Sequence, residues 1–137
     1  MDNLKIYCMC LQNSNLEIIK NLNYIPVGLK NNDFSKEWLR DNTKENISEK
    51  NPYYGEYTFY YWYWKNLLEY KKENEWVGFC SYRIYWGNKK NMNSNKLRDL
   101  VLQNYKPEWK NFDAIIGEPI SIGGTKVIKV IKYGKLA

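Results

Sequence analysis

A polar stretch over residues 41–56 runs directly into an aromatic block over residues 57–64, Tyr-Thr-Phe-Tyr-Tyr-Trp-Tyr-Trp. Asn51-Pro52 favours a helix start, and we expect this helix to continue to about Lys72. Its aromatic side chains cover every face, so the helix should be buried or flanked on most sides. A hydrophobic core does not account for so many Asn, Ser, Asp and Glu residues before one helix. A site for a polar ligand would account for these residues, so the stretch favours a binding function.

Length and composition indicate one soluble globular domain. The chain of 137 residues is long enough to bury a core, and 44% hydrophobic with 26% charged residues is typical of such domains. The net charge of +6 suits an anionic partner, but scattered lysines on a solvated surface account for much of it. Arginine, which base-edge recognition prefers, occurs only at Arg40, Arg83 and Arg98, so nucleic acid is not the favoured partner.

Histidine is absent and there are three cysteines. Without His the chain cannot form Ser-His or Cys-His nucleophile pairs, and a zinc site would need all three cysteines and a carboxylate. Cys8 and Cys10 would point to the same face of a strand and pack as small hydrophobic residues. Residues 1–10 carry no signal-peptide pattern, and no apolar run is long enough to span a membrane. We therefore expect a protein of the reducing cytoplasm.

Apolar runs alternate with turn residues in the order of a layered α/β domain. We predict strands at 4–10, 24–29, 76–82 and 112–117, helices at 15–22, 51–72 and 93–104, and a short helix at 35–39. Pro26 argues that the second strand is an edge strand or a loop. The alternation predicts a mostly parallel central sheet, in which ligands bind beyond the carboxyl ends of the strands.

Residues 121–137 form a basic, weakly patterned tail after a domain that we expect over residues 1–120. Several apolar residues between Val127 and Ile131 could add a helix or strand, but no capping residue marks one. The tail ends in Lys-Leu-Ala, which fits a natural end, a truncation or a few vector-derived residues.

Several motifs together resemble one protein family. They are Asp41-Asn42-Thr43, Asn46-Ile47-Ser48, Lys50-Asn51, Tyr54, Glu56, Thr58, Tyr61-Trp62, Trp64-Lys65-Asn66, Val77-Gly78 and Tyr82-Arg83. Over about residues 4–117 the chain resembles the domain-of-unknown-function 4422 family, whose members are regarded as bacterial glycosyltransferases of polysaccharide assembly. The resemblance implies a GT-A-like (Rossmann-like) fold, a nucleotide-sugar donor that we expect to be UDP-linked, and a glycan acceptor of the capsule or lipopolysaccharide kind. It also leaves room for peripheral contact with the inner membrane surface.

The chain departs from the family pattern at several positions. Ser81-Tyr82-Arg83-Ile84 stands where members usually have His-Tyr-Arg-Arg, and Leu11-Gln12 replaces a common His-Lys pair. Members are also longer, which implies that a carboxyl-terminal part with the acceptor site is lacking here. Without the family's His, the domain could bind its donor without catalysing transfer.

The resemblance places the donor pocket in the polar stretch. Candidate substrate-binding residues are Asp41, Asn42, Asn46, Ser48, Lys50, Asn51, Lys65, Ser81 and Tyr82. The residues alone leave a structural alternative open, a loop whose Asn, Asp and Ser side chains bond to their own backbone.

Glu56 and Arg83 are the candidate catalytic residues. Glu56 could act as general base, or it could only complement the helix dipole. Arg83 could stabilise the departing diphosphate in place of a metal, or form a surface ion pair. Because no Asp-x-Asp motif occurs, we expect no metal here, and a divalent metal held elsewhere stays open. Trp62 and Trp64 could stack on sugars, although core packing is the expected role of the aromatic residues.

A second function class competes with this one. The charge of +6 and the many aromatic residues would also suit a non-catalytic basic α/β module that binds nucleic acid or another anionic polymer. Such a module predicts strongly salt-dependent binding without any preference for nucleotide sugars.

Overall fold

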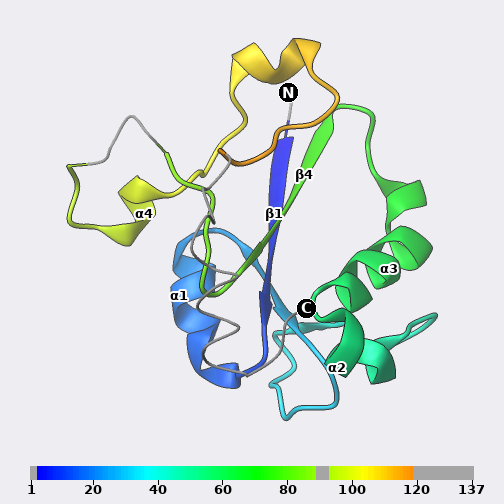
Figure 1. Cartoon of the computed structure of the whole chain (residues 1–137). Helices are drawn as coiled ribbons and strands as arrows, with labels where there is room; N and C mark the ends of the chain where they lie inside the picture. The colour runs from blue at the N-terminus through cyan, green and yellow to red at the C-terminus, as the bar shows by residue number, and fades with distance from the viewer. Residues whose placement is uncertain (1–2, 89–92, 119–137) are drawn as a thin grey trace, which may run out of the picture.

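The computed structural model describes residues 3–88 and 93–118, which form a layered, Rossmann-like α/β domain (Figure 1). Its sheet has four strands, all parallel, in the order β3-β2-β1-β4. The strands are β1 (Asn3–Cys10), β2 (Ile25–Gly28), β3 (Leu39–Arg40) and β4 (Glu75–Ser81). The prediction of a mainly parallel α/β sheet is confirmed.

Strand β1 lies in the middle of the sheet and is buried on both faces, as its continuous apolar run predicts. Cys8 and Cys10 face a core cluster on one side, whereas Tyr7 and Met9 face a second cluster on the other. Because successive side chains alternate across a strand, the prediction that both cysteines share a face is confirmed.

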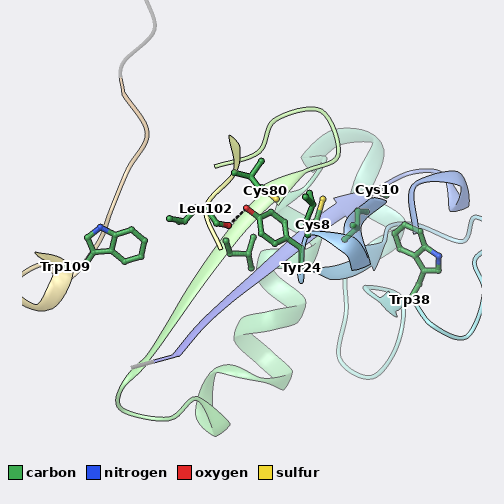
Figure 2. Close-up of a cluster of buried hydrophobic side chains, with 11 residues drawn as sticks. Cys8, Cys10, Tyr24, Trp38, Cys80, Leu102 and Trp109 are labelled. Atoms are coloured by element: carbon green, nitrogen blue, oxygen red, sulfur yellow. Dashed lines mark hydrogen bonds between the residues drawn. The ribbon is translucent and has the colours of Figure 1, made fainter. Parts of the chain in front are cut away.

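Helices on opposite faces of the sheet close these two clusters (Figure 1). Helix α1 (Leu16–Asn21) contributes Ile19 to the cysteine side. Helix α3 (Tyr57–Asn66) contributes Phe59 and Trp62 to the other side. Figure 2 shows the cysteine side, where the Tyr24 hydroxyl donates a 2.6 Å hydrogen bond to the Leu102 carbonyl oxygen.

Short elements connect this frame. Single turns of helix are η1 (Asn13–Asn15), η2 (Ser48–Lys50), α2 (Asn51–Tyr54), η3 (Leu68–Tyr70), α4 (Leu97–Leu100) and η5 (Pro107–Asn111).

The prediction of one continuous helix over residues 51–72 is wrong, because the helix is interrupted at two places. Gly55 has φ 55° and ψ −131°, a conformation open only to glycine in practice, and it separates α2 from α3. The second break follows Asn66, before η3. Within the described residues the sheet covers only one side of α3, and Tyr57 and Trp64 on the outer side are 69% and 56% exposed. The expectation that most faces would be covered is not met there.

Two further helix predictions are wrong. Residues 35–39 form a turn leading into β3, not a helix, and the helix over 93–104 shrinks to α4. Residues 101–102 instead run extended beside 86–88, where the Leu102 amide donates to the Trp86 carbonyl oxygen at 2.8 Å. Burial of Val101 and Leu102 in the core outweighs their weak helical pattern.

Residues 112–117 form no strand, and the fourth strand of the sheet is β3 instead. Phe112 and Ile116 are largely exposed, so this apolar run does not enter the core. Pro26 also lies in an inner strand rather than an edge strand. β3 pairs only with Val27 and Gly28, so the half of β2 that contains Pro26 has no neighbour on that side. The predicted tail over 121–137 lies outside the described residues.

Candidate functional site

The strand order creates a switch point at the carboxyl edge of the sheet. The chain moves from β1 to β2 and β3 on one side, then passes through α3 to β4 on the other side of β1. In open parallel sheets, ligands bind where the order reverses in this way, outside the carboxyl ends of the strands. Here that place lies between Leu11-Gln12 after β1 and Tyr82-Arg83 after β4.

Asp41 follows β3 and is completely buried. Its Oδ1 accepts a 3.0 Å hydrogen bond from the Lys30 amide, and its Oδ2 accepts one of 2.7 Å from the Thr58 hydroxyl. The Asn51 amide donates to Thr58 Oγ1 at 3.0 Å and to the Gly55 carbonyl oxygen at 2.7 Å. Burial raises the pKa of the Asp41 carboxyl above its ordinary value, against the opposing effect of these donors.

This network joins two predicted site residues, Asp41 and Asn51, but it does so inside the protein. Both side chains are buried and engaged by protein groups. They therefore fix the end of β3, the turn after β2 and the α2–α3 junction relative to one another. We assign them a positioning role at the edge of the site.

Asn46 and Ser48 are also brought together. Asn46 Oδ1 accepts hydrogen bonds from the Ser48 amide at 3.2 Å and the Ser48 hydroxyl at 3.0 Å, and its Nδ2 donates to the Lys44 carbonyl oxygen. Asn42 donates a 2.9 Å hydrogen bond to Asn31 Oδ1. The contacts of Asn46 with Ser48 and Lys44 are those of the structural alternative, a loop that satisfies its own backbone. A direct ligand contact by any of the three stays a prediction.

Lys50 and Lys65 lie on the exposed side of this region. The Lys65 ammonium is 3.4 Å from Glu45 Oε1 and 4.2 Å from the centre of the Trp64 ring. Trp62 is buried and donates a 2.7 Å hydrogen bond to the Thr43 carbonyl oxygen, whereas Trp64 is more than half exposed. Core packing therefore accounts for Trp62, and only Trp64 is free to meet a sugar.

The two candidate catalytic residues lie on different elements, and no hydrogen bond or ion pair joins them in the part of the chain that is described. Glu56 is exposed at the amino-terminal end of α3. Arg83 is exposed after β4, where its Nε donates a 2.8 Å hydrogen bond to the Tyr82 hydroxyl and its guanidinium lies 5.1 Å from the centre of the Tyr82 ring. Among residues 3–88 and 93–118 it forms no ion pair.

Ser81 and Tyr82 fix the backbone before Arg83. The Tyr82 amide donates to the Met9 carbonyl oxygen at 3.1 Å, and the Ser81 carbonyl oxygen accepts from the Ile84 amide. The segment is thus bound to the end of β1, and Arg83 is presented from a fixed turn.

Sequence reasoning did not single out Lys30, Arg40 or Thr58 on physical grounds. Thr58 was visible only as a motif residue. Lys30 has φ 63°, in the left-handed region, and no sequence pattern predicts a lysine there. Arg40 was noticed only as one of three arginines, yet it binds three carbonyl oxygens of the turn after β2.

The described residues contain no group of three or more His, Cys, Asp or Glu side chains that could hold a metal ion. Within the same residues, no helix combines the length and the apolar character needed to cross a bilayer. A depression of about 430 Å³ is lined by residues of the 98–106 segment with Asn23 and Asn88. Asn23 lies two residues before the start of β2, so this depression lies away from the carboxyl edge, and we do not place the site there.

A family model described as "Domain of unknown function (DUF4422)" matches residues 5–132 of the chain. The match includes β1 from Lys5 onward, the three other strands and both sheet-covering helices, and therefore the carboxyl edge. Searches of curated proteins and of solved structures gave no match.

Proposed function

The chain belongs to the domain-of-unknown-function 4422 family, and we propose that it is a glycosyltransferase-like domain. It would bind a nucleotide sugar, UDP-linked in the first instance, and transfer the sugar to a growing bacterial surface glycan. The observation that supports this proposal is the strand order β3-β2-β1-β4, with helices on opposite faces. In open parallel sheets such an order favours ligand binding at the carboxyl edge, which here lies beside the polar stretch.

The proposed chemistry needs a base for the acceptor hydroxyl and positive charge for the departing diphosphate. Glu56 is exposed, so an acceptor can reach its carboxylate. The exposed Arg83 offers a planar fork that matches phosphate oxygens. Asp41 and Asn51 would act indirectly, by holding the loops around the donor. A divalent metal, if the reaction uses one, would come with the donor or with groups outside the described residues.

The proposed setting is the cytoplasm, at the inner surface of the membrane where surface glycans are assembled. A peripheral contact there would bring the domain to its acceptor. This contact is tested by asking whether the domain sediments with vesicles.

A thermal-shift titration tests the proposed function. The ligands are UDP, UDP-galactose, UDP-glucose and GDP-mannose, each with EDTA and with added manganese. A ligand that binds only the folded state raises the melting temperature in a saturable manner. We expect a shift with the UDP compounds, and the comparison of EDTA with manganese shows whether a metal takes part.

Arg83→Gln should reduce the shift with UDP. Arg98→Gln on α4 serves as the matched control, since it removes the same charge away from the carboxyl edge. If no nucleotide shifts the melting temperature, and binding to oligonucleotides falls steeply with salt, the proposal is wrong. The basic binding module would then be favoured.

A further inference from the structure

The turn after β2, residues 28–32, is held by the guanidinium of Arg40. Its Nε donates to the Gly28 carbonyl oxygen at 3.2 Å, and its Nη2 donates to those of Lys30 and Asn32 at 2.6 and 3.1 Å. The same guanidinium lies 4.8 Å from the centre of the Phe34 ring. Three of the five N–H donors of the Arg40 guanidinium thus clasp the turn.

The opposite side of this turn is bound as well. The Lys30 amide donates to buried Asp41 at 3.0 Å, and the Leu29 amide donates to the Cys10 carbonyl oxygen at 3.0 Å. The Asn32 side chain donates a 2.7 Å hydrogen bond to the Leu11 carbonyl oxygen. The turn is therefore fixed both to β3 and to the end of β1, next to the switch point.

This fixed turn holds Lys30 at φ 63°, a left-handed conformation that a glycine would adopt without the steric cost a lysine meets. The Lys30 ammonium makes no hydrogen bond or ion pair with residues 3–88 or 93–118. The carboxylate nearest in the network, that of Asp41, is buried and bonded to the Lys30 backbone and to Thr58. The Lys30 ammonium, on a residue with an unfavourable backbone conformation, thus has no partner among the described residues at the carboxyl edge.

Lys30 follows β2 and Arg83 follows β4, the two strands that pair with β1 from opposite sides. Two strand spacings separate the strands β2 and β4 by about 10 Å, a gap that two long basic side chains can close around one ligand. We propose that Lys30 is an anion-binding residue of the site and contacts the diphosphate of the nucleotide donor from the side opposite Arg83. This inference rests on the proposed function for the identity of the anion.

The simplest competing explanation is that Lys30 is a solvated surface lysine. In that case Lys30→Gly should stabilise the fold, by relieving the left-handed backbone, and should leave ligand binding unchanged. If Lys30 binds the donor, Lys30→Gly should raise the melting temperature and yet weaken binding. The two effects have opposite signs, so misfolding cannot imitate the expected result.

The chain supplies a matched control in Lys44, which is exposed and has φ 50°. Lys44→Gly makes the same change in charge and in backbone freedom, but Lys44 lies outside the turn that Arg40 clasps. We would measure binding of UDP and of inorganic pyrophosphate by calorimetry at physiological salt, for the full chain and for Lys30→Gln, Lys30→Gly and Lys44→Gly.

We expect both Lys30 variants to bind UDP and pyrophosphate about tenfold more weakly or worse, as for loss of a charge-assisted contact, and Lys44→Gly to bind like wild type. Wild-type affinity in Lys30→Gln, an equal loss in Lys44→Gly, or no binding of either probe by wild type would overturn the inference. Unchanged UDP binding in Lys30→Gln would leave the proposed function standing. Pyrophosphate binding that depends on Lys30, without any binding of UDP compounds, would instead support the anion site and contradict the nucleotide donor.

Discussion

The Thr58 hydroxyl donates a 2.7 Å hydrogen bond to Oδ2 of Asp41, and so joins the residue after β3 to the first turn of α3. Both residues are fully buried. The contact is the point where the polar stretch meets the aromatic helix, and it explains why a carboxylate is found inside this domain. Its role is to hold the loops at the carboxyl edge in place.

Replacing Asp41 by Ala should destabilise the domain by about 2–3 kcal/mol, since the Lys30 amide and Thr58 lose a buried partner. Asp41→Asn should cost less than about 1 kcal/mol. An Asn at this position can accept from Lys30 and donate to Thr58, whose own proton can turn to the Gly55 carbonyl oxygen at 3.1 Å. Urea unfolding measures both values, and equal losses in the two variants would contradict this account of the network.

The difference in stability between wild type and Asp41→Asn should also depend on pH. The pKa of the Asp41 carboxyl is raised above 3.8, mainly by burial, so the folded state binds this proton more tightly than the unfolded state. From pH 3.8 up to the raised pKa, the contribution of this group to stability falls as pH rises, and above the raised pKa it stays constant. Wild type should therefore gain stability relative to Asp41→Asn when the pH is lowered from 7 towards 4. A loss relative to that variant in urea unfolding over this range would contradict the raised pKa.

Much of the sheet follows from sequence because it depends on local pattern. β1 is an apolar run buried on both faces, so its place in the middle of a parallel sheet, with Cys8 and Cys10 on one side, could be predicted. The two-residue β3 could not. It exists because Val27 and Gly28 offer an open edge to a passing chain, which no propensity of Leu39-Arg40 reveals.

The sequence reveals the polar stretch itself but not which of its side chains bond within the protein. The polar stretch does lie beside the carboxyl edge, but Asp41 and Asn51 turn inward to bond with Thr58 and Gly55. Which polar side chains form hydrogen bonds within the protein depends on contacts between elements far apart in sequence. A lysine at positive φ is likewise a product of such contacts, so Lys30 could not be identified beforehand.

Gly28→Ala should destabilise the domain by about 1–3 kcal/mol, because the added methyl group overpacks the site. A Cβ on Gly28 would lie 2.7 Å from carbon atoms of the Phe34 ring, which Arg40 and Trp38 flank on other sides. Gly87→Ala is the control, since a Cβ there meets no atom within 4 Å. The free energy of unfolding should fall for the first variant and stay within about 0.5 kcal/mol of wild type for the second. Similar free energies of unfolding for the two variants would show that the Phe34 ring moves aside at little energetic cost.

The three cysteine thiols should resist Ellman's reagent at pH 8 in the native protein. All are free and buried, and contact with the Cys8 thiol, followed by burial, raises the pKa of Cys10 above its ordinary value. Little reactive thiolate of Cys10 is then present, and burial denies the reagent access to all three sulfur atoms. In guanidinium chloride all three should react at once. Rapid reaction of one thiol without denaturant would show that the cluster around Cys8 and Cys80 opens locally.

Arg40→Lys keeps the charge but should loosen the turn after β2 and cost about 1–2 kcal/mol, because an ammonium cannot hold three carbonyl oxygens in one plane. The loss should be local. Amide exchange at Leu29 and Lys30 should quicken more than exchange in the middle of β1, since their hydrogen bonds belong to the clasped turn. Arg83→Lys is the control, as the described Arg83 guanidinium binds only the Tyr82 side chain and should leave stability within about 0.5 kcal/mol of wild type. If Arg40→Lys exchanges like wild type at Lys30, then the buried carboxylate of Asp41 holds the turn without help from Arg40.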